Sequence, residues 1–340
     1  MRGREVLPDT SSRTKRGISE ILRPYGLRMT LGNRKKHPKG SVKIGIDLGA
    51  TRIKMGLVDK RGRVSHRRQI NTPVNAKKKN VIDSLVENID GIISEAGIAR
   101  KNVAGIGMGV PGPTDFKKGI VRYFPNIKGW ENTPLKSILE KRLGLKVNID
   151  NDVNAMTLGE YVFGAGRGAG NVVCLTLGTG VGGGLILNGG IYRGSTMAAG
   201  EIGHIPINES GPRCNCRGMA CIESYIGNRY ILNRIKKIFG RAITLEELTR
   251  LAKKGNKAAK RIWEDVGTKL GIALTGVVNL LNPDIVVVGG GVSNAGELIL
   301  GPARLELKKR AMKDQAEHVK LVRARLGEDA GIIGASLLVN

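Results

Sequence analysis

The chain has 340 residues, of which 41% are hydrophobic and 25% are charged. At about 150 residues per domain this length predicts two domains, and the composition excludes a collagen, an intrinsically disordered chain and a membrane channel. Two values are unusual: 49 glycines, about twice the usual share of roughly 7%, and a formal net charge of +27.

The first 41 residues form a basic tail. Residues 1–40 contain eleven Lys and Arg residues, only three acidic residues and few apolar ones. Because such a segment buries little apolar surface, we expect residues 1–41 to be disordered. Its positive charge attracts the phosphates of any nucleic acid, whatever the base sequence. Binding sites for single-stranded nucleic acid interleave basic and aromatic residues. Only 4% of the chain is aromatic, so specific nucleic-acid binding is not expected.

No stretch of the sequence approaches the ~18 uninterrupted apolar residues of a membrane span. The first forty residues also lack the apolar core of a signal peptide. We therefore expect a cytoplasmic protein with no membrane partner.

From Val42 onward, short apolar runs alternate with amphipathic stretches. Alternating apolar and polar residues predict strands, and apolar residues at helical spacing predict a helix. The predicted order is strand, strand, strand, helix, strand, over residues 42–47, 53–57, the segment after a turn at 60–62, 82–96 and 103–110.

A similar series recurs in the second half of the chain. Strands are predicted over 172–177, 183–188, 191–193 and 284–288, and helices from near Val153 and over 223–238, 245–254 and 257–281. The repetition predicts an internal duplication and two α/β domains, with a ligand-binding cleft between them. We assign residues 42–120 and a C-terminal helix over 328–340 to a small domain, and residues 121–327 to a large one.

Glycine-rich turns follow the first strand of each half. Such a turn can point several backbone N–H groups into one concavity that binds an anion, and a threonine hydroxyl adds a donor. Neither turn is a P-loop or precedes a helix as in a Rossmann fold. Each turn alone is equally compatible with a plain β-hairpin. As a pair they predict two phosphate-binding turns, at Asp47, Gly49, Thr51 and Arg52 and at Gly178, Thr179, Gly180 and Gly182.

A third glycine run, Gly289, Gly290 and Gly291, follows a buried strand and precedes a helix near Ala295. This place suits the close approach of a flat ring such as adenine. The alternative is a bare strand-to-helix turn.

Three cysteines and a histidine lie within eighteen residues: His204, Cys214, Cys216 and Cys221. Thiolates and imidazole are ligands of tetrahedral zinc, so the cluster predicts a zinc site, with unliganded thiols as the alternative. Four protein ligands leave no open position, which makes the zinc structural. It would fix the His204 ring and leave its other nitrogen available to a ligand. Cys174 lies in an apolar strand and is predicted to be a core residue.

From Val42 to the C-terminus, several motifs in order resemble the ROK family (repressors, open reading frames, kinases). They are Asp47–Arg52, Gly109–Gly112, Pro125–Asn126 with Gly129–Trp130, Asp150–Ala155, Leu177–Gly184, Ala199–His204 and Cys214–Glu223. The resemblance implies an α/β fold of two ribonuclease-H-like domains, as in actin and hexokinase, flanking a cleft. It also implies a homodimer or homotetramer.

The activity that the resemblance implies is phosphorylation of a hexose by ATP, with Mg²⁺ accompanying the nucleotide. Asp152 corresponds to the catalytic base; the alternative is that Asp152 merely caps the helix that begins near Val153. Asp47 corresponds to the acid that holds the Mg²⁺–phosphate unit through water. The implied sugar-binding positions are Gly112, Asn126, Asn151, Asp152, Glu201, His204 and Glu223.

Four residues depart from the ROK pattern. Ala50 and Arg52 replace glycine and lysine of Asp-x-Gly-Gly-Thr-Lys, and Arg217 and Ala220 replace the glycines of Cys-x-Cys-Gly-x-x-Gly-Cys-x-Glu. The first two changes bear on tight phosphate binding. The other two predict a zinc loop of locally altered shape with its ligand spacing intact.

The ROK family also contains sugar-responsive repressors, whose winged-helix domain needs more residues than the forty that precede the core here. We therefore predict a glucokinase-like reaction, from glucose and ATP to glucose 6-phosphate and ADP. The alternatives are a sugar-sensing regulator, a kinase for N-acetylglucosamine, N-acetylmannosamine, allose or fructose, and a kinase that uses polyphosphate as its donor.

Overall fold

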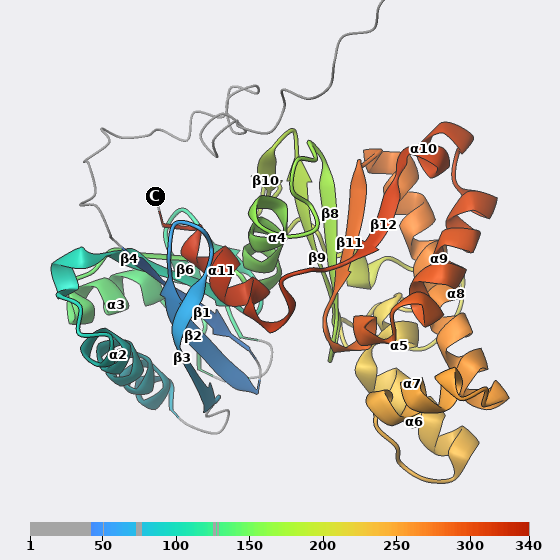
Figure 1. Ribbon diagram of the computed structural model, residues 1–340, viewed down its shortest axis with the longest axis horizontal. Coiled ribbons are helices and arrows are strands. Elements are labelled where there is room, and N and C mark those ends of the chain that lie inside the picture. Colours follow the sequence, from blue (N-terminus) through green and yellow to red (C-terminus); the bar gives the residue numbers. More distant parts are fainter. Residues whose placement is uncertain (1–41, 50, 73–76, 125–126, 128, 340) are drawn as a thin grey trace, which may run out of the picture.

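The structure is a computed structural model that describes residues 42–49, 51–72, 77–124, 127 and 129–339, so the expected basic tail lies outside the described residues. Two lobes lie side by side, and each is built around a five-stranded sheet with helices on its faces (Figure 1). This arrangement confirms the expected pair of α/β units.

The first sheet has the strand order β3-β2-β1-β4-β7. Its strands are β1 (Val42–Leu48), β2 (Arg52–Val58), β3 (Val64–Asn71), β4 (Val103–Val110) and β7 (Val147–Asn151). The first three form an antiparallel meander, and β4 and β7 continue the sheet in parallel with β1. The buried sides of α2 (Lys78–Glu95) and α3 (Leu135–Leu143) pack on this sheet. Between β4 and α3, β5 (Thr114–Asp115) and β6 (Ile120–Val121) form a small hairpin.

The second sheet has the strand order β10-β9-β8-β11-β12. Its strands are β8 (Val172–Leu177), β9 (Val181–Leu187), β10 (Gly190–Tyr192), β11 (Ile285–Gly289) and β12 (Lys320–Arg323). One face packs on α8 (Lys257–Leu281) and α9 (Glu297–Arg310). On the other face, α4 (Asp152–Val162) shares a buried cluster with Cys174, which is fully buried as expected. Coverage on both faces explains why β8 and β11 are continuous apolar runs.

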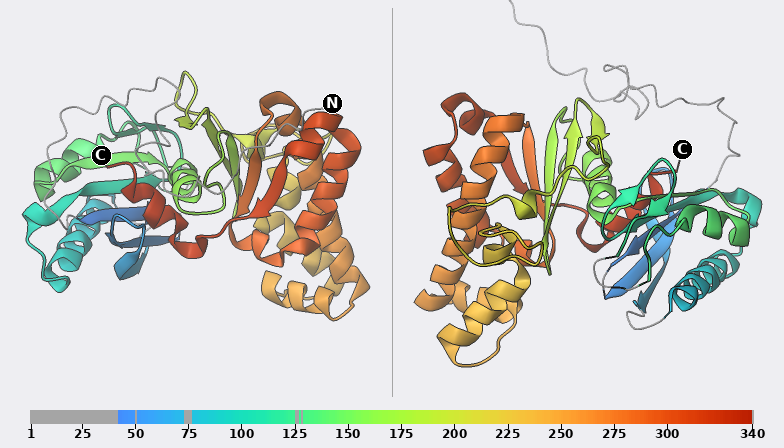
Figure 2. Two further views of the ribbon diagram at one scale, coloured as in Figure 1. Left: turned by 45° about the horizontal axis from the view of Figure 1, so that its top comes forward. Right: turned by 180° about the vertical axis from the view of Figure 1, so that it is seen from behind.

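Smaller helices complete the second lobe and the connections. They are α5 (Glu223–Ile226), α6 (Asn228–Phe239), α7 (Leu245–Lys253), α10 (Lys313–His318) and the 3₁₀ turns η2 (Arg100–Asn102), η3 (Ile202–His204), η4 (Gly291–Ala295) and η5 (Gly327–Asp329). The last helix, α11 (Ala330–Ser336), returns to the first lobe and lies between β1 and α4 (Figure 2). No helix in the described part of the chain is long and apolar enough to span a membrane.

Two expectations need correction. β7 pairs with β4, so the first sheet extends past the division expected at residue 120, and we move that division to the start of α4. The helix expected over 223–238 is two helices, because the backbone of Gly227 is extended (φ −65°, ψ 147°).

The chain crosses between the lobes twice, through α4 and through the segment between β12 and α11 (Figure 1). One buried carboxylate holds both crossings. Glu160, in the last turn of α4, is fully buried and accepts the N–H groups of Ala165 (2.8 Å), Arg325 (3.0 Å) and Leu326 (2.8 Å). Charge-assisted hydrogen bonds of this kind are stronger than neutral ones, so Glu160 ties the end of α4 to the segment that leads to α11.

We expect Glu160→Gln to lower the free energy of unfolding by about 2–3 kcal/mol, because the amide turns its own N–H groups toward backbone N–H groups. Denaturant unfolding of the full chain measures the change. Glu87→Gln, an exposed position on α2, is the matched control and should change the free energy by less than about 0.5 kcal/mol. Equal effects of the two substitutions would contradict the role of Glu160.

Candidate functional site

The site begins at one edge of the first sheet. In the sheet register Asp47 of β1 lies beside Gly109 of β4, and Gly109 lies beside Asp150 of β7. These strands are parallel, so their carboxyl ends meet at the edge where ligands bind in open α/β sheets. Asn151 and Asp152 follow directly, as β7 gives way to α4. The fold therefore brings the first glycine turn close to the predicted base.

Asn151, and not Asp152, is the N-cap residue of α4. Its Oδ1 accepts the N–H groups of Val153 (2.9 Å) and Asn154 (3.3 Å), and its Nδ2 donates to the carbonyl oxygen of Gly112 at 3.3 Å. Asp152 Oδ1 also accepts the N–H of Val153 at 2.9 Å. No described residue donates a hydrogen bond to Asp152 Oδ2, so one carboxyl oxygen remains available to a ligand.

The carboxyl groups of this edge influence one another. Burial raises the pKa of Asp152 to about 7, and the negative charges of Asp47 and Glu201 contribute to the rise. Burial also raises the pKa of Asp47, against the positive charge of Lys54. Neighbouring carboxylates with raised pKa values are stabilised by a cation, and oxygen ligands are those that Mg²⁺ prefers. The acid pair Asp47 and Asp152 therefore fits the hydrated Mg²⁺ of a nucleotide.

The second glycine turn and the third glycine run lie together at the edge of the second sheet. β8 and β11 are parallel neighbours, and a Cβ atom on Gly290 (φ +83°) would lie only 2.4 Å from the carbonyl oxygen of Leu177. Gly178 and Gly291 both line a pocket of about 420 Å³ that opens beside them. Gly289, the last residue of β11, is buried and does not line this pocket.

The other wall of this pocket comes from α6 and the start of α7, which the sequence did not predict as part of a site. Asn228 and Leu232 of α6 and Val292 of η4 line it. Asn228 Oδ1 is buried and has no hydrogen-bond partner among the described residues, so it can accept a bond from an N–H or O–H group of a ligand. An apolar pocket with one such acceptor fits the adenosine part of ATP.

The remaining glycines of the second turn serve packing. A Cβ atom on Gly180 would lie 2.4 Å from Glu223 Oε2, and one on Gly182 would lie 2.5 Å from Val153 Cγ2. The turn closes through a hydrogen bond from the N–H of Gly178 to the carbonyl oxygen of Gly180 (2.9 Å). Thr179 at its tip is exposed. These contacts place the turn against both α4 and Glu223.

The first glycine turn also closes through a backbone hydrogen bond, over one more residue. The N–H of Gly49 donates to the carbonyl oxygen of Arg52 at 2.9 Å, and Thr72 Oγ1 donates to the carbonyl oxygen of Gly49 at 2.7 Å. Thr51 and Arg52 are exposed. The hydrogen bond from Lys54 lowers the pKa of Glu328, and the positive charge of Arg52 makes a smaller contribution. Ala50, one of the departures from the expected pattern, lies outside the described residues.

Three of the predicted sugar-binding residues come from the second lobe. Glu201 precedes η3, and His204 Nε2 lies 3.8 Å from Glu201 Oε2. Glu223 begins α5, and its Oε2 accepts the N–H of Val181 at 3.0 Å. This contact joins Glu223 to the second glycine turn. Asn126 lies outside the described residues.

The predicted zinc ligands are brought together. The ligand atoms of His204, Cys214, Cys216 and Cys221 all lie within 4.8 Å of one another. The Sγ atoms of Cys216 and Cys221 are 3.7 Å apart, and Cys214 Sγ lies 3.6 Å from His204 Nδ1. Zinc–sulfur bonds of about 2.3 Å in a tetrahedron place two sulfur atoms about 3.8 Å apart. The donor set and its spacing therefore fit zinc, with His204 Nδ1 as the ligand and Nε2 turned toward Glu201.

The sequence model of the ROK family matches residues 43–340. The chain belongs to the ROK family. A glucokinase of Thermotoga maritima is 35% identical over 310 residues, which cover 87% of this chain and 96% of that protein. A putative xylose repressor of Caldicellulosiruptor sp. is 33% identical over 87% of this chain and 77% of the repressor.

Among solved structures, a ROK family glucokinase from Streptomyces griseus in complex with glucose and AMPPNP has a TM-score of 0.76 at 32% sequence identity. The comparison covers 88% of this chain and 99% of that one. The ROK match thus includes both lobes and all the site residues described above.

The two departures from the ROK zinc motif occupy left-handed backbone. Arg217 has φ +73° and Ala220 has φ +56°, a region in which a side chain costs about 1–2 kcal/mol. These are the motif positions where glycine is usual. The loop of this ROK protein therefore keeps a turn that suits glycine, at a steric cost, and its four ligand atoms still converge.

Proposed function

We propose that this ROK protein is a glucokinase that converts glucose and ATP into glucose 6-phosphate and ADP. The observation that carries the proposal is the state of Asp152, whose pKa is raised to about 7 and whose Oδ2 has no partner among the described residues. The glucokinase of Thermotoga maritima and the Streptomyces griseus structure with glucose and AMPPNP support the choice of sugar and nucleotide.

The sugar would lie between Asp152 and the second lobe. A polyol needs several convergent donors and acceptors. The site offers donors and acceptors from both lobes. The first lobe supplies Asn151 Nδ2, and the second supplies His204 Nε2 and the carboxylates of Glu201 and Glu223. Glu223 Oε2 accepts the N–H of Val181 at 3.0 Å, and its Oε1 lies 3.6 Å from Cys214 Sγ. A zinc-bound thiolate at Cys214 has no proton to donate, so Oε1 would then be available to a sugar hydroxyl.

Asp152 would act as the general base. A sugar hydroxyl is a poor nucleophile while it keeps its proton, and a carboxylate within hydrogen-bond reach can accept that proton as the phosphoryl group is transferred. When bound, MgATP supplies the phosphoryl group and a cation that balances its charge. The residues that would hold it are Asp47, the backbone of Gly49 and Gly178, and Asn228 beside the adenosine part.

We also propose that His204, Cys214, Cys216 and Cys221 bind one structural zinc ion. The spacing of their ligand atoms supports this assignment. A metal on Nδ1 of His204 would require the proton of the neutral ring to reside on Nε2. His204 would then be a hydrogen-bond donor toward the sugar.

A coupled assay of ADP release with glucose and a panel of other hexoses and N-acetylhexosamines tests the proposed function. We expect the highest kcat/KM with glucose. Failure to turn over any sugar, together with DNA binding that changes when sugar is added, would instead indicate a sugar-sensing regulator like the repressor relatives.

Replacing the base should remove turnover and keep binding. We expect Asp152→Asn to lower kcat by about 10²–10⁴-fold, the usual contribution of a general base. Glucose binding by calorimetry should change little, because the amide keeps an oxygen and the size of the side chain. A variant that retains parental kcat would contradict the assignment of Asp152.

The raised pKa of Asp152 sets a pH dependence. The carboxyl group is the base only when ionised, so kcat/KM should be highest above pH 7 and fall about tenfold per pH unit below it, with a midpoint at the pKa of about 7. Initial rates between pH 5 and about 9 at constant ionic strength measure the midpoint. A midpoint near the ordinary value for aspartate would contradict this expectation.

Zinc content is a separate test. The purified full chain should hold about one zinc ion, and Cys216→Ser should lose it and unfold at a lower temperature, because three ligands bind zinc far more weakly than four. Asn215→Ser is the matched control, since Asn215 is exposed and lies between two of the ligands. Equal zinc content in the two variants would contradict the site.

A further inference from the structure

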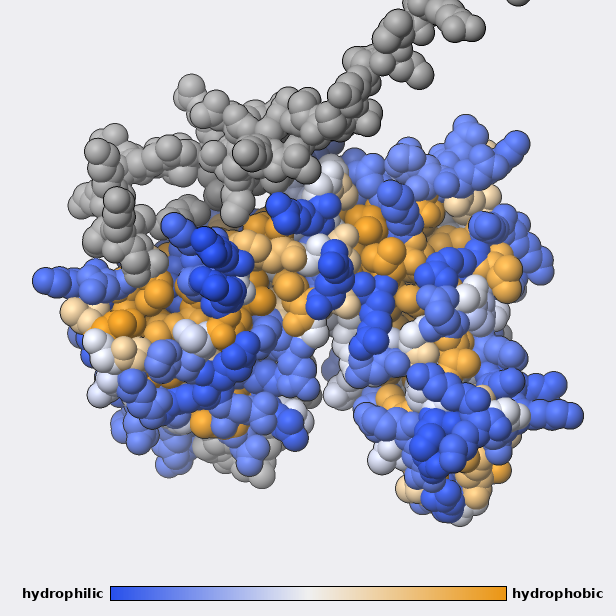
Figure 3. Space-filling model, in the orientation of Figure 1, coloured by the Kyte–Doolittle hydropathy of each residue, from blue (hydrophilic) through white to orange (hydrophobic). Residues whose placement is uncertain are grey.

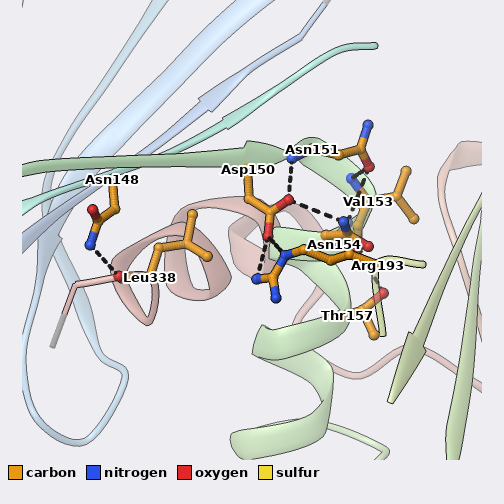
Figure 4. Close-up of polar contacts among 8 residues, drawn as sticks. All are labelled: Asn148, Asp150, Asn151, Val153, Asn154, Thr157, Arg193 and Leu338. Atoms are coloured by element: carbon orange, nitrogen blue, oxygen red, sulfur yellow. Dashed lines mark hydrogen bonds and ion pairs between the residues drawn. The ribbon is translucent and has the colours of Figure 1, made fainter. Parts of the chain in front are cut away.

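Asp150 is a buried carboxylate two positions before Asp152, the proposed general base. It is only 1% exposed. Both of its carboxylate oxygens accept hydrogen bonds, so neither oxygen is left for the sugar. Oδ1 accepts the N–H of Asn151 at 2.8 Å and Nδ2 of Asn154 at 3.1 Å. Oδ2 accepts Nε and Nη2 of Arg193 at 2.9 and 2.6 Å (Figure 4).

Arg193 reaches Asp150 from the other sheet. It follows β10, at the edge of the second sheet, whereas Asp150 lies in β7, at the edge of the first. The space-filling view shows the surface hollowed between the two lobes (Figure 3). The pair is therefore a direct polar contact between the lobes, at the same edge as Asp152.

Two further contacts fix Arg193. Its guanidinium group lies over the ring of Phe116, 3.9 Å from the ring centroid, and Phe116 belongs to the turn between β5 and β6. Its carbonyl oxygen accepts the N–H of Ala199 at 3.0 Å, two residues before Glu201. Arg193 thus contacts Asp150, two positions before Asp152, through its side chain. Through its backbone it contacts the loop that carries Glu201.

We propose that Arg193 is a positioning residue for phosphoryl transfer: it holds Asp150, and through it the backbone that presents Asp152, in register with the loop that carries Glu201. The role rests on the proposed kinase function. A buried carboxylate without its cation is costly and would reorganise or take up a proton. Displacement of Asp152 by about 1 Å is enough to reduce turnover by about a hundredfold.

Lysine cannot reproduce this arrangement. Arg193 uses two different nitrogen atoms on Asp150 Oδ2 while its flat face covers Phe116. A lysine ammonium is a compact group without a planar face, so it can supply the charge but not the stacking and the paired donors. Arg193→Lys therefore keeps the positive charge at this position but removes the stacking and the paired hydrogen bonds.

The test compares kcat and KM of the full chain with those of Arg193→Ala and Arg193→Lys. We expect Arg193→Ala to lower kcat about a hundredfold, with KM for ATP within about threefold of the parent, and Arg193→Lys to lie between. Guanidinium ion at low millimolar concentration should restore part of the kcat of Arg193→Ala, whereas sodium chloride should not. A double variant with Asp150→Asn should be no slower than the slower single variant.

Arg304→Ala is the matched control, because Arg304 makes a two-nitrogen ion pair with Glu297 on α9 (2.6 and 3.2 Å), and its kcat should equal that of the parent. If Arg193→Ala does not fold, Arg193→Lys decides by the same kcat comparison. An unchanged kcat, a rise in KM alone or the absence of guanidinium rescue would overturn the role of Arg193. A parent chain without turnover would overturn the proposed function and this role with it, whereas an active parent with unaffected variants overturns the role alone.

Discussion

The position of α4 is the constraint on which the rest of the site depends, and buried carboxylates fix this helix at both ends. Asp150 lies two positions before its first residue and is held by Arg193 from the other sheet. Glu160 in its last turn accepts N–H groups from both crossings between the lobes. An unpaired buried carboxylate is costly, so each group enforces its set of contacts. Asp152, the first residue of α4, therefore has little freedom relative to either sheet.

The electrostatics of the site are opposite to those of the whole molecule. The chain carries a net charge of +27, yet the negative charges of Asp47 and Glu201 both contribute to the raised pKa of Asp152. A positive protein attracts an anionic nucleotide from solution. The local carboxylates repel that nucleotide unless it arrives with its cation or they take up protons. The positive net charge of the chain and the negative carboxylates of the site together favour binding of the magnesium complex over binding of the free nucleotide.

Short-range patterns were enough to predict most of the fold. The strands over 103–110 and 172–177 and the helix over 257–281 agree with the structure, because buried strands and a long amphipathic helix have clear periods. Motifs predicted the residues of the candidate site, and the catalytic role of Asp152 stays a prediction. Contacts between distant segments have no such signal: Arg193 and Asp150 are 43 positions apart, and Glu160 and Arg325 are 165 apart. Nor does a lone glycine show whether it breaks a helix, as Gly227 does.

Close packing and the approach of a ligand are two of the physical causes of the many glycines, and the sequence alone does not separate them. Gly182 and Gly290 are required by packing, because a Cβ atom there would lie 2.5 Å from Val153 and 2.4 Å from Leu177. At Gly178 and Gly291 an added Cβ atom would meet nothing within 4 Å, and both positions line the same pocket. At Gly178 and Gly291, open space together with the shared pocket, and not the density of glycines in the sequence, identifies backbone that a ligand can approach. A methyl group at an open position opposes only the ligand, whereas one at a packed position opposes the fold.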